Sequence, residues 1–279
     1  SKVSQDRGLI RYLMRHRHTT PFEMVEFKFH CKMPIFVARQ WVRHRTANIN
    51  EYSLRYSEAR DEFYFPDPDH IEFQSTLNKQ GRMGEVDEDL KKKVQAYFKE
   101  ISDRSFEIYC ELNEAGVARE LARAILPVNL YTEWYWKNDL HNLLHFIGLR
   151  SDGHAQYEIR VFSDAMATYV KEVAPFAWEA YQDYVVNGMR FSKIERSILE
   201  RKLPERVLND IQEDISYQLT ASLHANKPRE DKDLFPLYNQ QGGTDSLEDF
   251  NLKWSSGEIV VGNVRELREF KLKIESLKQ

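Results

Sequence analysis

The sequence has few cysteines, no long apolar run and no apolar leader segment. Its 279 residues include only Cys31 and Cys110, which are too few for a disulfide framework and are not spaced as a metal pair. No stretch approaches the roughly 18 apolar residues that a bilayer-spanning helix needs, and residues 1–6 lack the apolar core of a secretory signal. We therefore expect a soluble cytoplasmic protein with no membrane partner and with both cysteines as buried small side chains.

A net positive charge is found at the start of the chain, whereas the remainder is net negative. Residues 1–60 carry 12 Lys and Arg against 5 Asp and Glu, whereas the other residues carry 28 against 39. A duplex-binding protein usually spreads basic residues along an extended face and is basic overall. The local excess instead favours a compact site for a small phosphorylated ligand and indicates no nucleic-acid partner.

The densest charge lies in residues 43–56, with the sequence RHRTANINEYSLRY. A hydrophobic core would not tolerate these ions unless each were paired or bound. The preceding residues 34–42 are mostly apolar, and Pro34 stands at a natural first helical position. This pattern predicts a partly buried helix that delivers a turn-prone segment to a multiply charged ligand.

Hydrophobic periodicity predicts a mostly helical chain with some strand. Alternation of Val25, Phe27, Phe29 and Cys31 with polar residues predicts a strand over 24–31, and a second strand is expected over 130–136. Helical spacing predicts a first helix over 6–16, capped by Asp6. The apolar face of this helix comprises Leu9, Ile10, Leu13 and Met14.

Further helices are expected over 90–112, 139–149, 155–173, 204–220 and 264–277. Gly116 stands where a left-handed helix stop is expected, and Pro175 ends or kinks the 155–173 helix. The buried side of that helix is predicted to comprise Ile159, Phe162, Met166, Tyr169 and Val173. The composition changes after about residue 190, so we expect a main domain over 1–190 and an appendage over 191–279.

Four candidate groups could carry chemistry, and each has a structural alternative. His141 and His145 share a helix face at a spacing that can bind a metal, but no glutamate follows His141 and no third ligand is evident. Structural histidines or contacts to an organic cofactor are the alternatives. The basic segment 15–18 complements the first helix dipole, and His18 and Thr20 could instead reach a ligand.

Ser53 and Arg150 present similar choices. A serine nucleophile needs a positioned base and an oxyanion hole, and Glu51 alone supplies neither, so a hydrogen-bonding serine is favoured. Arg150 opens the polar segment 150–156 between two helices. That segment is either a capping loop or a mount for an arginine that offers its fork of donors to a carbonyl or phosphate.

Taken together, the motifs resemble one known family. Arg43-His44-Arg45, seven residues and then Ser53 match the signature of the flavin-dependent thymidylate synthases. Four more blocks, at 18–23, 34–41, 126–132 and 149–156, match in order, so the similarity runs from about residue 4 to about residue 190.

This resemblance implies an α+β, helix-rich single catalytic domain with a small, mostly antiparallel sheet, followed by a C-terminal helical appendage. Members form homotetramers that bind flavin adenine dinucleotide (FAD) and deoxyuridine monophosphate (dUMP) where subunits meet. They methylate uracil C5 with 5,10-methylenetetrahydrofolate as the carbon donor, and FAD reduced by NADPH supplies the hydride. No enzyme nucleophile adds to the uracil, in agreement with a non-covalent Ser53.

The resemblance also implies residue roles. The flavin contacts are His18, Thr20, Glu23, Arg43, His44, Arg45, Glu51, Asp139, His141, His145 and His154. The nucleotide contacts are Gln40, Arg43, Glu51, Ser53, Leu54 and Arg55, with Arg123 and Arg150 reaching in from another subunit. Arg150 matches the arginine that favours an ionised uracil N3, because a fixed guanidinium stabilises negative charge on the ring and makes C5 nucleophilic.

The sequence departs from the family at three places. Members usually carry an N-terminal strand with an Ala-Arg-Val-Ser-like segment, so a truncated start is expected here. Some members have asparagine or arginine where this chain has His141 and His145, and the segment after residue 190 is longer than in the smallest members. The rival hypothesis is a histidine-metal hydrolase acting on a phosphorylated small molecule.

Overall fold

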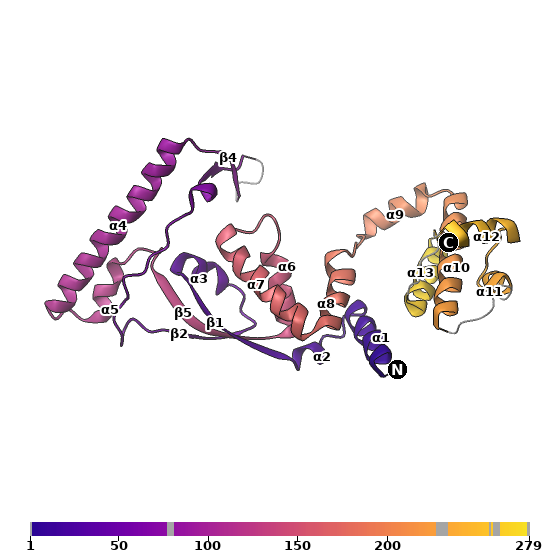
Figure 1. Cartoon of the computed structure of the whole chain (residues 1–279), viewed down its shortest axis with the longest axis horizontal. Helices are drawn as coiled ribbons and strands as arrows, with labels where there is room; N and C mark the ends of the chain where they lie inside the picture. Colours follow the sequence, from indigo (N-terminus) through magenta and orange to yellow (C-terminus); the bar gives the residue numbers. More distant parts are fainter. Residues whose placement is uncertain (1, 77–80, 227–233, 257, 259–262, 278–279) are drawn as a thin grey trace. The chain divides into compact units, whose positions relative to one another are not determined.

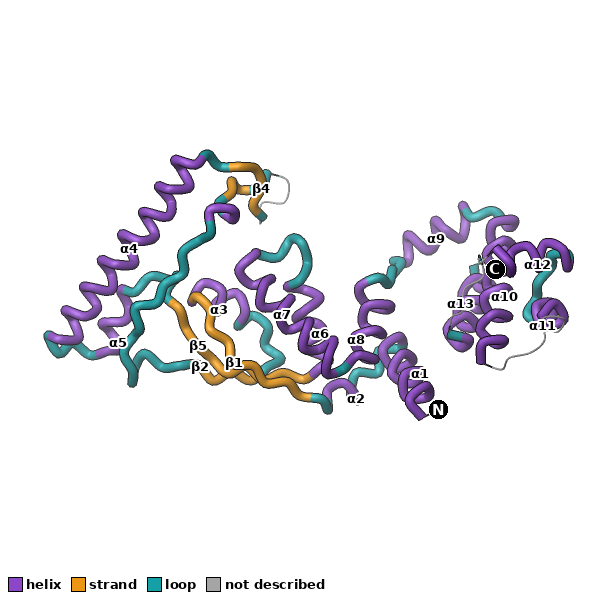
Figure 2. The backbone as a smooth tube through the Cα atoms, in the orientation of Figure 1, coloured by secondary structure: helices purple, strands orange, loops and turns teal. Residues whose placement is uncertain are grey.

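The computed structural model describes residues 2–76, 81–226, 234–256, 258 and 263–277. The chain divides into two compact units, residues 1–188 and 189–279, each of which is described by itself (Figures 1 and 2). The first unit combines two small antiparallel sheets with helices, whereas the described residues of the second unit form helices and their connections. The expected α+β, helix-rich class is confirmed.

A three-stranded antiparallel sheet forms the centre of the first unit. Its strands are β1 (Glu26–Pro34), β5 (Tyr131–Asp139) and β2 (Asn48–Glu51), in the order β1-β5-β2. Cys31 and Glu51 both lie opposite Trp134, so the central strand joins an early strand to the charged segment. Residues 48–51 therefore form a strand, where the sequence predicted only turns.

Side-chain alternation places the core on one face of this sheet. Trp134, Trp136 and Asn138 of β5 are buried there. The helices on this face are α3 (Ile35–Trp41), α6 (Leu140–Arg150) and α7 (Tyr157–Val173) (Figure 1). Trp41 lies 5.3 Å from the Trp136 ring and 5.0 Å from the Phe146 ring, between centroids. This aromatic cluster fixes α3 and α6 against β5.

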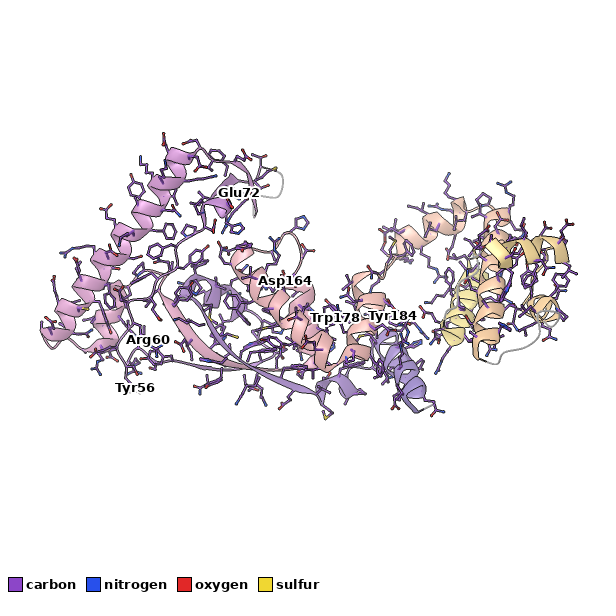
Figure 3. All side chains as sticks on the ribbon, viewed as in Figure 1. Tyr56, Arg60, Glu72, Asp164, Trp178 and Tyr184 are labelled. Carbon is purple, nitrogen blue, oxygen red and sulfur yellow. The ribbon has the colours of Figure 1, made fainter. Side chains whose placement is uncertain are left out.

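The chain enters and leaves this unit through neighbouring helices. Helix α1 (Lys2–Arg15) packs against α8 (Pro175–Tyr181). A π-helical turn, η3 (Gln182–Val186), follows α8, and the Arg11 guanidinium lies 4.9 Å from the centroid of the Tyr184 ring in it (Figure 3). The short helix α2 (Thr20–Glu23) packs against α6 and buries Phe22.

A long helical arm completes the first unit. Helix α4 (Glu88–Glu114) is capped by Asp87 and ends before Gly116, whose φ of +80° is the left-handed conformation expected there. The arm also holds α5 (Arg119–Ala122), η2 (Arg123–Ile125), η1 (Pro68–His70) and the hairpin of β3 (Glu72–Gln74) and β4 (Arg82–Glu85). Tyr97 and Ile101 of α4 are more than half exposed, so this helix presents apolar side chains at the surface.

The described part of the second unit contains helices α9 to α13. Their bounds are α9 (Lys193–Lys202), α10 (Glu205–Asn226), α11 (Leu234–Gln240), α12 (Leu247–Ser256) and α13 (Val264–Ser276). Leu208, Ile215, Leu219 and Ile274 join α10 to α13, and an aromatic cluster around Tyr217 joins α10 to α11 and α12. The predicted helices over 204–220 and 264–277 are confirmed.

Several details of the sequence prediction are wrong. Asp6 lies inside α1 and does not cap it, and Leu9 is exposed because only Ile10, Leu13 and Met14 of that face reach the core. Tyr169 and Val173 are also exposed. The buried positions of α7 follow Ile159, Ser163, Met166 and Val170, a face rotated from the predicted one. Cys31 is buried as expected, whereas Cys110 is only partly buried.

Candidate functional site

The charged segment begins with one buried residue between two exposed ones. Arg43 and Arg45 are exposed, whereas His44 is only 8% exposed. The backbone N–H of His44 donates to the Trp41 carbonyl over 2.9 Å, which turns the chain inward directly after α3. The sequence Arg-His-Arg thus places two cations at the surface and one imidazole inside.

The His44 ring is held by groups from β5 and α6. Its Nε2 lies 3.3 Å from Asn138 Nδ2 and 3.2 Å from Thr46 Oγ1. An amide nitrogen can only donate, so this orientation makes Nε2 the acceptor and leaves the ring proton on Nδ1. The His145 ring centroid lies 5.8 Å from that of His44, and the Phe146 centroid lies 5.4 Å away. We call His44, Asn138, His145 and Arg150 the His44 group.

The His44 group keeps its imidazole neutral. Burial lowers the pKa of His44, and the charges of His145 and Arg150 lower it further, against the opposing effects of the Asn142 backbone and Asp139. Burial also lowers the pKa of Arg150 without threatening its charge at neutral pH. The group therefore combines a neutral hydrogen-bonding ring with a fixed cation.

Arg150 stands in the last turn of α6, and its side chain is partly buried. Its Nε is buried and has no hydrogen-bond partner among the described residues, and the same is true of Asn138 Oδ1 and Gln40 Oε1. Buried polar atoms are nearly always hydrogen-bonded in native proteins, so each of these atoms calls for a partner. A bound polar ligand would supply it.

The start of α6 is shaped by Asp139. Its two carboxylate oxygens accept from the backbone N–H of Asn142, over 2.9 Å, and from the Asn142 side-chain amide, over 2.7 Å. His141 follows on the same helix and is partly buried. Helix α2 packs against α6, so Thr20 and the partly buried Glu23 of α2 lie on an element next to α6. The exposed His18 lies just before α2 and stacks on Tyr12.

The second half of the charged segment forms a separate group with α5. Thr132 Oγ1 donates to Glu51 Oε1 over 2.7 Å, and the Arg55 backbone N–H lies 3.3 Å from Ser53 Oγ, which accepts from it. Leu54 packs beside the core cluster around Tyr109. Arg55 pairs with Glu120 of α5 over 2.8 Å, three residues before the partly buried Arg123. Residues 51–55 and Arg123 thus belong to adjoining elements of one chain.

His154 stands apart from both groups. It is 80% exposed by its side chain, and its Nδ1 lies 2.8 Å from Asp152 Oδ1 within the same loop. The Asp152 carboxylate also caps this turn through the His154 backbone N–H. Its predicted flavin contact stays a prediction.

Sequence reasoning missed Asn138 and Thr46 as parts of the site. Asn138 is 2% exposed and follows the inward alternation of Trp134 and Trp136 along β5. A buried asparagine in an apolar alternation requires a polar partner, so that pattern was the available signal. Thr46 carried no such signal, because its role depends on the turn after α3.

The described residues give no support to a metal centre. No cluster of three or more His, Cys, Asp or Glu side chains that could hold a metal ion occurs among them, and His145 lies beside His44 instead. The rival hydrolase hypothesis loses its central feature. Over the same described ranges, no helix is both long and apolar enough to span a bilayer.

The chain is similar to proteins of one family. The family described as thymidylate synthase complementing protein matches residues 1–176. The flavin-dependent thymidylate synthase of Ehrlichia ruminantium (strain Gardel) is 54% identical over 199 residues, which is 71% of this chain and 67% of that protein. Its counterpart from Rickettsia prowazekii is 48% identical over 223 residues, covering 75% of this chain and 76% of the relative.

A solved structure extends the similarity to the fold. A UMP/dUMP methylase from Streptomyces cacaoi, bound with 5-bromo-UMP, superposes with a TM-score of 0.61 at 34% identity. The match covers 64% of this chain and 83% of the methylase. With the family match over most of residues 1–188 and relatives near 50% identity, the chain belongs to the flavin-dependent thymidylate synthase family.

Proposed function

We propose that the protein methylates dUMP to dTMP, with 5,10-methylenetetrahydrofolate as the carbon donor and NADPH-reduced FAD as the hydride source. The observation that carries the proposal is the His44 group, in which a neutral buried imidazole lies within the field of an arginine whose Nε has no partner in the described chain. Because the chain belongs to the flavin-dependent thymidylate synthase family, we take the ligands of this group to be the flavin and the nucleotide.

The residues fit a flavin dinucleotide. Arg43 and Arg45 are exposed cations on either side of the buried His44, which suits a ligand with a diphosphate and an aromatic ring. Asn138 Oδ1 is a buried acceptor without a partner among the described residues, so it can receive a donor from the flavin, whereas Gln40 Oε1 can receive one from the nucleotide. His18, Thr20, Glu23, Asp139, His141, His145 and His154 complete the proposed set. When bound, the flavin supplies the hydride.

The chain's own residues would bind and polarise the nucleotide. Arg150 would stabilise negative charge at uracil N3, which raises the nucleophilicity of C5. Ser53 and Arg55 would hold the phosphate by hydrogen bonds, with the Ser53 hydroxyl as a binding group and not a nucleophile. Arg55 would exchange its exposed pairing with Glu120 for the phosphate, at little cost, because surface ion pairs are weak.

Absorbance and NADPH oxidation test the proposal together. Purified protein should carry flavin or take it up, and it should oxidise NADPH faster when dUMP is added. Deoxyuridine is the matched control, because it offers the same ring without the phosphate and should stimulate far less. A colourless protein that cannot be reconstituted with FAD would contradict the proposal.

We also propose a cytoplasmic homotetramer in which Arg123 and Arg150 complete the site of another subunit. The exposed Tyr97 and Ile101 of α4, four residues apart on one helix, support an interface, since neighbouring exposed apolar side chains are often covered by a partner. Mixing inactive Arg55→Ala and Arg123→Ala proteins tests the sharing of sites. Activity should return if the two residues come from different subunits, and it should stay absent if both come from one chain.

A further inference from the structure

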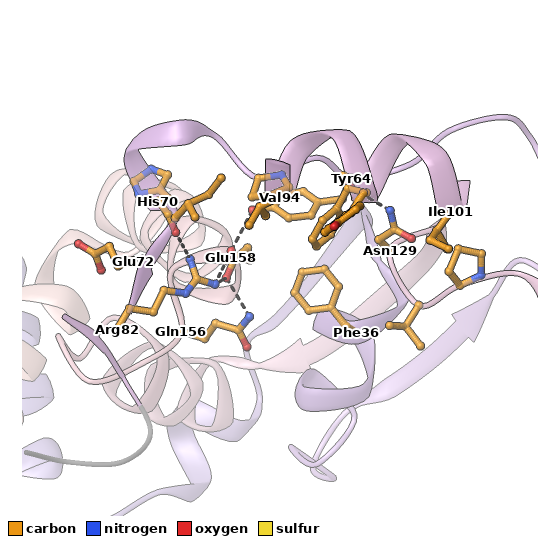
Figure 4. Close-up of a pocket in the computed structure, with 16 residues that line it drawn as sticks. Phe36, Tyr64, His70, Glu72, Arg82, Val94, Ile101, Asn129, Gln156 and Glu158 are labelled. Carbon is orange, nitrogen blue, oxygen red and sulfur yellow. Dashed lines mark hydrogen bonds and ion pairs between the residues drawn. The ribbon is translucent and has the colours of Figure 1, made fainter. Parts of the chain in front are cut away.

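A buried carboxylate in the first turn of α7 makes four hydrogen bonds. Glu158 is 5% exposed. Arg82 Nη2 donates to both of its oxygens, over 2.6 and 2.7 Å, and the Tyr64 hydroxyl donates to Oε1 over 2.8 Å. Gln156 Nε2 donates to Oε2 over 2.8 Å. We call Glu158 with these three donors the Glu158 network (Figure 4).

The charge of Glu158 is firmly held. Burial by itself would raise the pKa of Glu158, but the hydrogen bonds from Arg82 and Tyr64 outweigh it and lower the pKa. Burial and the neighbouring carboxylate raise the pKa of Tyr64, so its hydroxyl stays a donor. Each carboxylate oxygen already accepts two bonds, so Glu158 has little capacity left for a ligand.

The Glu158 network joins segments that lie far apart in the sequence. Arg82 Nη1 donates to the His70 carbonyl over 2.9 Å, which ties β4 to η1. The Tyr64 carbonyl accepts from Asn129 Nδ2 over 3.0 Å, and the same amide lies 3.0 Å from Ser102 Oγ of α4. The network therefore links the α4 arm to the first turn of α7.

The same network reaches the loop that follows Arg150. Gln156 ends this loop, and its amide is one of the three groups that donate to Glu158. At the other end, Ser151 Oγ lies 2.9 Å from the fully buried Ser163 Oγ of α7. Residues 151–156 are thus anchored to α7 at both ends, directly beside the last turn of α6.

A cavity of about 730 Å³ lies beside the network, and most of its wall is apolar (Figure 4). Phe36, Val94 and Ile101 line it, while Arg82, Gln156 and Glu158 form a polar end. Because the polar groups at this end form hydrogen bonds with each other, we expect them to stabilise the fold and not to bind a ligand. Low exposure strengthens these bonds and excludes competing water.

We propose that Arg82 and Glu158 are positioning residues for Arg150. By fixing Gln156, they fix the loop 151–156 and so hold the last turn of α6 in the orientation that presents the Arg150 guanidinium to the nucleotide. The inference rests on the proposed function, in which Arg150 stabilises negative charge on uracil. A misplacement of about 1 Å in such a group can lower turnover by about 100-fold.

Glu158→Gln tests this role, because it keeps the shape of the side chain but removes its charge and one acceptor. The probe is 5-bromo-dUMP, whose N3 proton is more acidic than that of dUMP and whose ionisation changes its ultraviolet absorbance. With the full-length flavin-loaded protein, a pH titration of the bound analogue reports how strongly Arg150 favours the ionised ring, without turnover. The wild-type protein should lower the ionisation pH of the analogue relative to free solution.

In Glu158→Gln, the ionisation pH should return toward that of the free analogue by about one pH unit, because a nearby cation shifts a pKa by about 1–3 units. Flavin absorbance should be unchanged. Glu179→Gln is the matched control, since Glu179 also accepts from two arginines, Arg7 and Arg11, but on α8. It should titrate like the wild type.

The outcomes separate the two proposals. If the wild-type protein does not bind the analogue or does not shift its ionisation, the proposed function fails. If the wild type shifts it and a folded Glu158→Gln shifts it equally, the positioning role is overturned. Should Glu158→Gln not fold, Arg82→Lys decides, because it keeps the cation but loses the fork. An intermediate shift supports the role, and a wild-type shift contradicts it.

Discussion

Two buried polar regions of the first unit differ in how completely their atoms are paired. In the Glu158 network, the carboxylate accepts four hydrogen bonds from three side chains. In the His44 group and on nearby α3, four buried atoms have no partner among the described residues: Arg150 Nε, Asn138 Oδ1, Gln40 Oε1 and Trp41 Nε1. The chain itself pairs every oxygen of the first carboxylate, whereas the second region leaves buried atoms that a ligand can pair.

The difference shows how one protein can separate rigidity from chemistry. A saturated network holds a single arrangement because every alternative leaves a buried charge unpaired. An unsaturated group gives up some stability and keeps its donors and acceptors for the ligand. If this division is correct, substitutions in the two regions should affect different measurements.

The largest effect is expected from Arg150→Ala. It should reduce methyl transfer by about 10²–10³-fold, which is typical when one preorganised donor to a developing charge is lost. Flavin absorbance and the melting temperature should change little, because Arg150 Nε forms no hydrogen bond within the described chain. The rate is measured by dTMP formation. Near-normal dTMP formation would remove Arg150 from the mechanism.

The converse effect is expected from Arg82→Ala, which should lower stability as well as turnover. Removing one partner of a fully buried ion pair costs roughly 3–5 kcal/mol. Arg82 is 33% exposed, so we expect about 2 kcal/mol, measured by denaturant unfolding of the first unit. Arg104→Ala on the surface of α4 is the control and should have almost no effect.

The pH dependence of that loss follows from the lowered pKa of Glu158. A carboxylate whose pKa is lower in the folded state stabilises the fold above its unfolded pKa of about 4.3. This contribution disappears as the pH falls through the folded value. The difference between wild type and Arg82→Ala should therefore be full at neutral pH and should shrink below about pH 4. A difference that is constant with pH would contradict the ionic origin of the network.

The sequence predicted the elements better than their contacts. Alternation at Phe27, Phe29 and Cys31 identified β1, and Gly116 marked the end of α4, because both signals are local. The His141 and His145 spacing correctly indicated one helix face. It could not show that His145 meets His44, since that contact joins residues 101 positions apart and depends on the packing of Trp41 against Phe146.

The burial of Glu158 could not be predicted from the sequence either. A glutamate in the first turn of a helix is typical of a favourable dipole partner facing water, and nothing in the neighbouring sequence shows that Glu158 is buried. It is buried because Arg82 and Tyr64, from distant segments, converge on it. The Glu158 network could therefore be identified only from the tertiary structure, which brings these segments together.

A smaller effect is expected from Ser53→Ala. Its hydroxyl accepts from the Arg55 backbone N–H over 3.3 Å, a long bond that orders the turn, and no general base contacts it in the described chain. We expect kcat to stay within about tenfold of the wild type and KM for dUMP to rise, since losing one hydrogen bond to a charged group costs about 1.5–3 kcal/mol. Complete loss of turnover with dUMP binding preserved would restore the nucleophile hypothesis.

The smallest effect is expected from His44→Asn, which should change how steeply the stability of the first unit depends on pH. Its pKa is lowered in the folded state by burial and by electrostatic interaction with His145 and Arg150, so the unfolded chain binds the proton more readily. Stability should therefore fall as the pH drops through the unfolded histidine value of about 6.5. His44→Asn cannot take up this proton, so its stability should depend less on pH between about 7 and 5.5.

The exposed His154→Asn is the control and should keep the wild-type slope. Unfolding followed by tryptophan fluorescence measures the slope, because Trp41, Trp134, Trp136 and Trp178 all lie in the first unit. Equal slopes in wild type and His44→Asn would mean that the pKa of His44 is the same in the folded and unfolded chains, which would contradict the lowered pKa of the buried ring.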